Sequence, residues 1–176
     1  MVYIGIGSNL ESKFGDRHRN INLAISLLTN ETVKLIKKSS FYETLSQPNI
    51  NDPKFLNVVV SVETKLSPVD LMKALIAIEK KLGRIRRKKN DPRTCDMDII
   101  DFNGLIKNFR FDNSELILPH KSLNKRNFVL YPLQEISSNW IHPQTKKNIN
   151  FLINNLKKVN NQITKLSEND INAHVK

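Results

Sequence analysis

The chain has 176 residues, of which 39% are hydrophobic and 26% charged, and its formal net charge at pH 7 is +11. This length suits one domain with a hydrophobic core and is too short for two, and the composition is that of a globular protein. No apolar run reaches the length of a membrane span, and the single cysteine, Cys95, excludes an internal disulfide. The positive charge indicates an anionic partner or a solvated basic surface.

The N-terminal part of the chain alternates between strand-like and helix-like segments. Residues 2–9 are β-rich and end in turn-forming residues, which predicts a first strand and not a signal peptide. Apolar residues recur at helical spacing over 16–28, which predicts an amphipathic helix. Two further strands are predicted over 32–45 and 55–66, separated by the turn-rich loop 46–54.

A second helix and a fourth strand complete a recognisable order. Ser67 is placed as the N-cap of a helix, Pro68 occupies its first position, and Gly83 is a typical stop. Residues 95–104 follow as a strand that ends in Asn-Gly. The resulting order β-α-β-β-α-β predicts an α+β fold, a ferredoxin-like sandwich with an antiparallel sheet.

Further elements are expected beyond this unit. They are a short hairpin over 105–118, a helix from His120 to about Ile136 that is interrupted near Pro132, and a polar tail over 156–176 that is partly helical or disordered. We therefore expect one functional domain over 1–155, followed by that tail.

Positive charge is concentrated just before the fourth strand. Residues 79–93 contain eight Lys and Arg side chains and two acids, so six of the eleven excess charges lie within 15 residues. Asp96 and Asp98 follow, and being two apart on a strand they point to the same face. Carboxylates this close repel unless a cation separates them or one is protonated. Mg²⁺ suits the pair, because it takes one or two carboxylates and completes its shell with water and phosphate oxygens.

The cations extend this metal hypothesis to a polyphosphate ligand. Arg93 and the basic run ahead of it would supply guanidinium forks for the phosphates that the metal bridges. Each feature also has a plainer interpretation. The two acids alone fit a solvent-facing strand, and the basic run alone fits a solvated or nucleic-acid-binding patch.

Four other residues become candidates if the fold brings them together. Phe55 and Phe128 are ordinary core residues by type, but two rings lining one cleft would sandwich a flat heterocycle. Asn57 lies two residues after Phe55 on the same strand face and would hydrogen-bond the polar edge of that heterocycle. His120 follows a proline, where a histidine is more often structural.

Several motifs coincide with one family. In chain order they are "YIGIGSNL" (3–10), "SSFYET" (39–44), "FLNVVVSVET" (55–64), "IEKKLGRIR" (78–86), "DPRTCDMDII" (91–100), "LPHKSLNKRNFVLYPLQEI" (118–136) and "IHP" (141–143). On these stretches the sequence resembles the 6-hydroxymethyl-7,8-dihydropterin pyrophosphokinases of folate biosynthesis. The resemblance implies a ferredoxin-like fold that transfers pyrophosphate from ATP, the co-substrate, to the pterin hydroxymethyl group and releases AMP, with two Mg²⁺ ions.

The resemblance also implies roles for individual residues. The metal ions would be carried by Asp96 and Asp98, which with Arg84 and Arg93 would form the catalytic centre. ATP would be contacted by Glu79, at the rim of its site, and by Arg84, Arg86, Arg93, His120 and Arg126. The pterin would be bound by Thr44, Phe55, Asn57 and Phe128. Two positions depart from the family pattern: Ile76 replaces a glutamine near the adenine, and Asn90 replaces a loop tryptophan.

Two alternatives stand beside this interpretation. An RNA-binding module has the same element order and a basic charge, but the chain lacks the aromatic-rich strands that stack bases, and Asp96 and Asp98 would repel a nucleic-acid backbone. A pterin kinase that also contacts other folate-pathway enzymes is the second, because many relatives are fused to neighbouring enzymes. We expect small-molecule substrates, no nucleic acid, no membrane and a cytoplasmic location.

Overall fold

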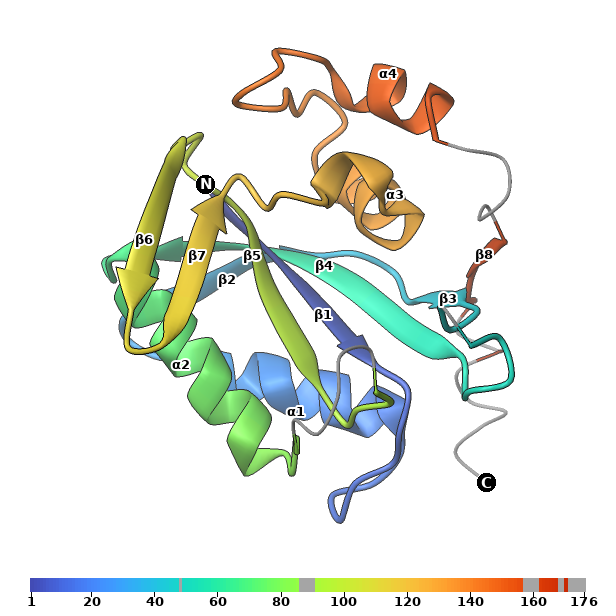
Figure 1. Ribbon diagram of the computed structural model, residues 1–176. Coiled ribbons are helices and arrows are strands. Elements are labelled where there is room, and N and C mark those ends of the chain that lie inside the picture. The colour runs from blue at the N-terminus through green and yellow to red at the C-terminus, as the bar shows by residue number, and fades with distance from the viewer. Residues whose placement is uncertain (48, 86–90, 157–161, 168–169, 171–176) are drawn as a thin grey trace.

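An antiparallel sheet forms the centre of the molecule in the computed structural model, which describes residues 1–47, 49–85, 91–156, 162–167 and 170 (Figure 1). Its strands are β1 (Val2–Ser8), β2 (Val33–Lys38), β3 (Tyr42–Thr44), β4 (Phe55–Thr64), β5 (Asp96–Phe102) and β8 (Ile163–Lys165). They follow the order β5-β1-β4-β3-β8, and β2 pairs with β4 on the same edge as β3. This confirms the predicted ferredoxin-like α+β class.

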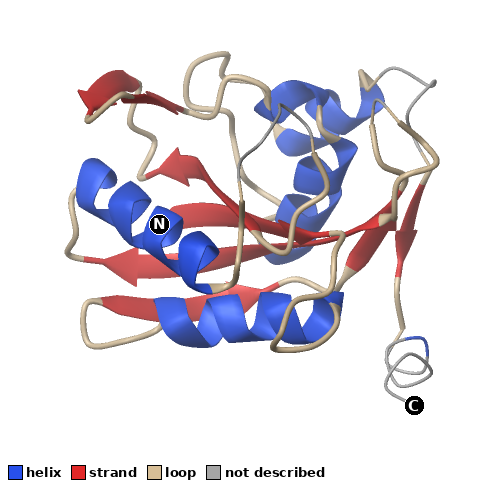
Figure 2. Ribbon diagram, turned by 60° about the horizontal axis from the view of Figure 1, so that its bottom comes forward, coloured by secondary structure: helices blue, strands red, loops and turns tan. Residues whose placement is uncertain are grey.

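Helices cover both faces of the sheet (Figure 2). On one face lie α1 (Arg17–Leu28) and α2 (Pro68–Lys81), and on the other lies α3 (Asn127–Ile136) with α4 (Ile149–Asn154) packed on it. A 3₁₀ turn, Leu123–Lys125, precedes α3, and a hairpin of β6 (Lys107–Phe111) and β7 (Ser114–Leu118) follows β5. Of the helices that the structure describes, none has the length and apolar character needed to span a bilayer.

Each face of the sheet has its own hydrophobic core, because side chains alternate along a strand. Val58 and Val60 on β4 belong to the core under α1 and α2, whereas Val59 between them belongs to the core under α3 and α4. The helices α1 and α2 begin where the sequence predicts: Asp16 accepts the amide of Arg19 at 2.8 Å, and the hydroxyl of Ser67 accepts that of Asp70 at 3.2 Å. The two cores thus fix both helix layers against one sheet.

A bulge in β5 sets which of its side chains face α3. Tyr3 pairs with Asp101 and Ile4 with Ile99, so Ile100 is an extra residue on β5. As a result, two consecutive residues face α3: Ile100 joins the core there, and Asp101 accepts a hydrogen bond from the indole of Trp140, in the same core, at 2.8 Å. The segment before the bulge keeps regular alternation.

Several elements differ from the sequence predictions. The strand predicted over 32–45 is two strands, β2 and β3, which both pair with β4 and are separated by residues 39–41. The helix predicted from His120 begins only at Asn127, and Pro132 lies inside it without ending it, since packing of the apolar face outweighs one lost hydrogen bond. The tail contributes β8, which pairs with β3 and was not predicted.

Candidate active site

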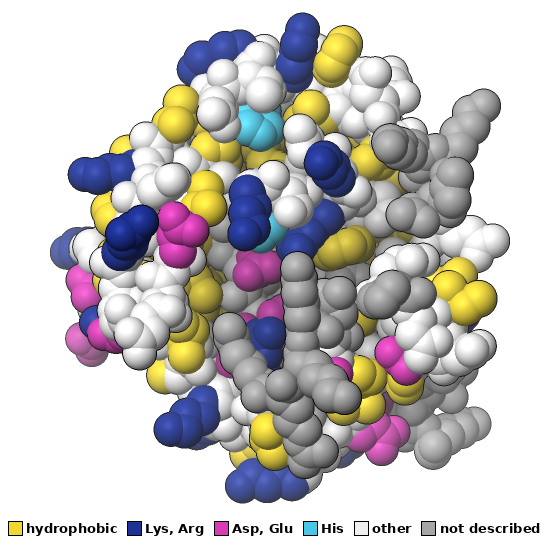
Figure 3. Space-filling model, viewed as in Figure 1, with side chains coloured by type: hydrophobic (Ala, Val, Ile, Leu, Met, Phe, Trp, Pro, Cys, Tyr) yellow, Lys and Arg dark blue, Asp and Glu magenta, His cyan; other side chains and the backbone are white. Residues whose placement is uncertain are grey.

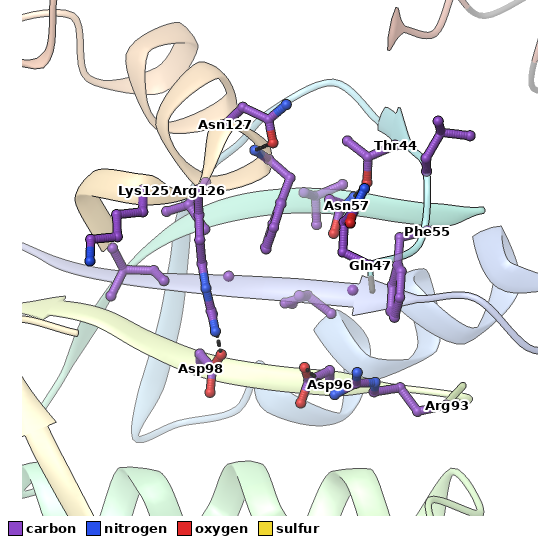
Figure 4. A pocket seen from close by; sticks show the side chains of 18 of the residues that line it. Thr44, Gln47, Phe55, Asn57, Arg93, Asp96, Asp98, Lys125, Arg126 and Asn127 are labelled. Carbon is purple, nitrogen blue, oxygen red and sulfur yellow. Dashed lines mark hydrogen bonds and ion pairs between the residues drawn. The ribbon is translucent and has the colours of Figure 1, made fainter. Parts of the chain in front are cut away.

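A cavity of about 650 Å³ opens on the α3 side of the sheet. Its lining comes from β1, the β3–β4 region, β5, the segment that opens α3, and the start of β8. Figure 3 shows acidic side chains in a hollow of this face with basic side chains beside them. Figure 4 places Asp98, Arg126 and Lys125 toward one end of the cavity and Phe55, Asn57, Thr44 and Gln47 toward the other.

The two carboxylates predicted from their spacing do face this cavity (Figure 4). Asp96 Oδ1 lies 2.5 Å from Arg84 Nη1, and Asp96 Oδ2 lies 3.1 Å from Arg93 Nη1. Asp98 Oδ2 lies 3.2 Å from Arg126 Nη1. The structure thus brings both aspartates together with three of the predicted arginines, of which Arg126 lies 28 residues beyond its partner Asp98 in the sequence.

Glu79 lies beneath this cluster and not at the rim where the resemblance placed it. Its side chain is only 2% exposed, because its carboxylate is used inside the protein: it accepts the amide of Met97 at 2.7 Å and pairs with Arg84. Burial disfavours the charged form of Arg84, but the Asp96 and Glu79 carboxylates outweigh it and raise the pKa of the guanidinium. Arg84 is therefore a fixed cation behind Asp96.

Arg93 is held from the turn that follows β1. Its amide donates to Asn9 Oδ1 at 2.7 Å, and its carbonyl accepts from the amides of Asn9 and Leu10 at 3.0 and 3.1 Å. The guanidinium lies 5.2 Å from the centre of the Phe55 ring, within cation–π range. Arg93 Nε is buried with no hydrogen-bond partner among the described residues. This side chain joins the charged end of the cavity to its aromatic end.

His120 lies beside Asp98 in its neutral form near pH 7. Burial lowers the pKa of His120, Asp98 acts in the opposite direction, and Arg126 lowers it further. Its Nδ1 accepts the amide of Ser122 at 3.2 Å, so the proton of the neutral ring is on Nε2. Nε2 lies 3.9 Å from Asp98 Oδ2, too far for a hydrogen bond, and is a donor suited to a phosphate oxygen.

The other end of the cavity has the groups expected for a flat heterocycle. Phe55 from β4 and Phe128 from α3 both line it, as do Asn57 and Thr44. Asn57 is 5% exposed, and its Nδ2 donates to Thr44 Oγ1 at 3.1 Å. A Cβ on Gly7 would lie 3.1 Å from Asn57 Oδ1, so glycine leaves room for that amide. All four residues predicted for the pterin thus share one cavity.

Sequence reasoning missed several lining residues. Among them are Gly5, Gly7, Gln47, Lys125, Asn127 and Gln162. The alternation of glycines in β1 was a signal, because glycine in a strand often marks a close approach to the backbone. Lys125 adjoins Arg126, which was singled out. Ile76, the departure near the expected adenine, packs against the core, and Arg86 and Asn90 lie outside the described residues.

The carboxylates fit a magnesium site that is completed by substrate. Among the residues with described positions, no group of three or more His, Cys, Asp or Glu side chains is arranged to hold a metal ion. Mg²⁺ does not require one, since it binds through one or two carboxylates, water and phosphates. Asp96 and Asp98 offer such oxygens beside a cavity with room for phosphates.

Fold and site together define a ferredoxin-like α+β protein with paired carboxylates and arginines beside an aromatic pocket. The chain belongs to the 7,8-dihydro-6-hydroxymethylpterin-pyrophosphokinase (HPPK) family, whose model matches residues 3–138. It is similar to the 2-amino-4-hydroxy-6-hydroxymethyldihydropteridine pyrophosphokinases of Aquifex aeolicus, with 39% identity over 146 residues, and Haemophilus influenzae, with 36% over 145. These alignments cover 83% and 82% of this chain and 86% of each relative.

Longer relatives contain the same region. The folic acid synthesis protein fol1 of Schizosaccharomyces pombe is 34% identical over 146 residues, which cover 82% of this chain and 19% of that protein. The chain therefore spans about a fifth of the length of this relative. The structure of Plasmodium falciparum HPPK-DHPS superposes with a TM-score of 0.68 at 14% identity, covering 87% of this chain and 44% of that one. This structural similarity supports the fold assignment alone.

Proposed function

We propose that the chain transfers pyrophosphate from ATP to the hydroxymethyl group of 6-hydroxymethyl-7,8-dihydropterin, giving the pterin diphosphate and AMP. The observation that carries this proposal is one cavity in an HPPK-family chain that combines the Asp96–Asp98 pair with two aromatic side chains. The hydroxymethyl oxygen would attack the β-phosphorus of ATP while the bond from that phosphorus to the α–β bridging oxygen breaks. The alcohol proton leaves to water, and AMP departs.

The pterin would bind at the aromatic end. Phe55 and Phe128 would stack on its faces, and Asn57 and Thr44 would hydrogen-bond its edge. This places the hydroxymethyl group toward the carboxylates. Positioning of this kind supplies much of the rate enhancement in phosphoryl-type transfer, so a strong general base is not required.

ATP would bind at the charged end, where ion pairs would change partners. Mg²⁺, two ions in the resemblance, would be held by Asp96 and Asp98 and would neutralise phosphate oxygens when bound. Arg93 and Arg126, now paired with those carboxylates, would then donate to the phosphates. Arg84 stays with Glu79 and keeps Asp96 oriented, while Nε2 of His120 donates to a phosphate oxygen.

The first test is the nucleotide product. Incubation of the chain with ATP and Mg²⁺ should yield AMP only when 6-hydroxymethyl-7,8-dihydropterin is present, with no ADP, as measured by ion-exchange chromatography. The matched variant Asp98→Asn should form AMP at least roughly 10²-fold more slowly. ADP formation, or AMP release that does not depend on the pterin, would overturn the proposal.

The cellular setting remains a prediction. Contact with other folate-pathway enzymes is suggested by the longer relatives, of which this region is a part. The absence of nucleic acid from the function follows from the small-molecule substrates proposed here, and a cytoplasmic location stays a prediction from the sequence.

A further inference from the structure

The strand β8 (Ile163–Lys165) lies beyond residues 3–138, the part matched by the family model, yet it forms the edge of the sheet beside β3 (Figure 1). Its register pairs Lys165 with Tyr42 and Ile163 with Thr44. The amide of Leu166 donates to the carbonyl of Phe41 at 2.9 Å and continues this pairing. The C-terminal segment is therefore built into the sheet at the strand that carries Thr44, a residue of the cavity.

One ionised carboxylate fastens this strand to α3. Glu135 Oε1 lies 3.4 Å from Lys165 Nζ and accepts the amide of Ser40 at 3.1 Å, while its Oε2 accepts the hydroxyl of Tyr42 at 2.8 Å. Burial alone would raise the pKa of Glu135, but the hydrogen bonds from Ser40 and Tyr42 outweigh it and lower that pKa. Leu166 adds apolar packing against the core. These contacts hold the C-terminal end of β8 in place.

Gln162 directly precedes β8 and lines the cavity. Extending the antiparallel register one residue past the Thr44–Ile163 pair places Gln162 opposite Leu45, another lining residue. Thr44 accepts a hydrogen bond from Asn57, so the part of the cavity next to β8 is the end expected to bind the heterocycle. In Figure 4, Thr44 and Asn57 lie away from Asp98 and Arg126. Gln162 therefore lies next to Leu45, at the end of the cavity where the ring edge is expected.

We infer that Gln162 is a substrate-binding residue that closes the pterin end of the cavity and hydrogen-bonds the edge of the ring. This inference rests on the proposed function. The substrate named for the relatives carries 2-amino and 4-hydroxy groups, a donor and an acceptor on one edge. A glutamine amide offers the complementary acceptor and donor. Specificity for the pterin would then depend in part on a segment outside the region matched by the family model.

Gln162→Met tests this, because methionine has nearly the same length and cannot make these hydrogen bonds. Loss of one or two such bonds should raise the Kd and the KM for the pterin by about 3- to 10-fold, with kcat and the KM for ATP changed by less than about twofold. The Kd is measured by titrating the pterin into protein with a non-hydrolysable ATP analogue and Mg²⁺. Gln144→Met, at an exposed position outside the cavity, is the matched control and should match the wild type.

A second experiment, with a pterin analogue, tests the contact between Gln162 and the edge of the ring. For a pterin analogue without the 2-amino group, the difference in Kd between the wild type and Gln162→Met should shrink. An unchanged pterin Kd in Gln162→Met, or an equal rise in the KM for ATP, would overturn the inference. A wild-type chain that makes no pterin-dependent AMP would instead overturn the proposed function, so the two failures are separable.

Discussion

The carboxylate of Glu79 on α2 accepts the backbone amide of Met97 on β5 at 2.7 Å. The same Glu79 oxygen pairs with Arg84, which in turn contacts Asp96. A helix on one side of the sheet is thereby connected to a cavity on the other. Changes at Glu79 should consequently affect both stability and the site.

Glu79→Gln should lower the free energy of unfolding by about 3 kcal/mol, because Glu79 is 2% exposed and its loss weakens a buried ion pair. Urea denaturation measures this change. The control Glu63→Gln, at an exposed position of β4, should alter it by less than about 0.5 kcal/mol. Equal effects of the two substitutions would contradict the buried network.

Asp98→Asn should reduce kcat by roughly 10²-fold or more, because it removes charge from the proposed magnesium site while preserving shape. Steady-state AMP production measures kcat, and circular dichroism verifies the fold. Asp112→Asn, at a side chain that is 72% exposed, is the matched control and should retain full activity. Full activity in Asp98→Asn would refute the metal assignment.

Arg93→Lys keeps the charge but loses the planar fork that spans two phosphate oxygens. We expect kcat to fall by about 10- to 100-fold and the pterin Kd to change by less than about threefold. Arg110→Lys on the exposed face of β6 serves as the control. If kcat and pterin affinity fell in parallel, a role for Arg93 mainly near the phosphates would be wrong.

Gly7→Ala should weaken pterin binding selectively. The new Cβ would lie 3.1 Å from Asn57 Oδ1, so the amide that faces the ring must shift. The KM for the pterin should rise by about 3- to 10-fold at an unchanged KM for ATP. Gly5→Ala is the comparison, because its Cβ meets Ile100 Cδ1 at 3.2 Å and leaves Asn57 alone. Similar pterin KM values for the two variants would count against this role of Asn57.

Stability should fall as the pH is lowered below about 6.5, the ordinary pKa of histidine. Burial lowers the pKa of His142 although Asp101 acts in the opposite direction, so below that pH the unfolded chain binds a proton that the folded chain does not. Protonation at Nδ1 would also disrupt the hydrogen bonds it accepts from the amides of Gln144 and Thr145, at 3.2 and 3.3 Å.

Urea denaturation between about pH 5 and pH 7.5 measures this dependence, with a slope of at most about 1.4 kcal/mol per pH unit for one proton. His142→Asn keeps an acceptor but does not titrate, so its slope should be shallower. The remaining slope is assigned to His120, whose pKa is also lowered. Equal slopes in the variant and the wild type would exclude His142 as a contributor.

Local patterns were sufficient to predict the carboxylate pair and most of the elements. The shared face of Asp96 and Asp98 follows from strand alternation, and the start of α2 follows from Ser67 and Pro68. The late start of α3 was not predictable in the same way. The residues before α3 form a turn, in which the amide of Leu123 donates a hydrogen bond to the carbonyl of His120 at 3.0 Å. The spacing of apolar residues does not reveal this turn.

Tertiary contacts account for what the sequence could not show. Glu79 is buried because α2 packs across β5, and no neighbour in sequence indicates that. The strand β8 is three residues long and exists through its pairing with β3, so a window along the chain carries little signal for it. Gln162 belongs to the cavity only through that pairing.

The extra residue in β5 also determines how this chain tolerates changes in length. Asp101 is anchored to Trp140 and to the amide of Gly104, at 2.8 and 2.9 Å, so the end of β5 cannot rotate freely. Deletion of Ile100 would leave Ile99 opposite Ile4 and Asp101 opposite Tyr3, as neighbours in a regular strand, so Asp96 and Asp98 would still face the cavity. A one-residue deletion at the bulge would therefore spare the orientation of the carboxylates and remove instead the Ile100 side chain from the core under α3.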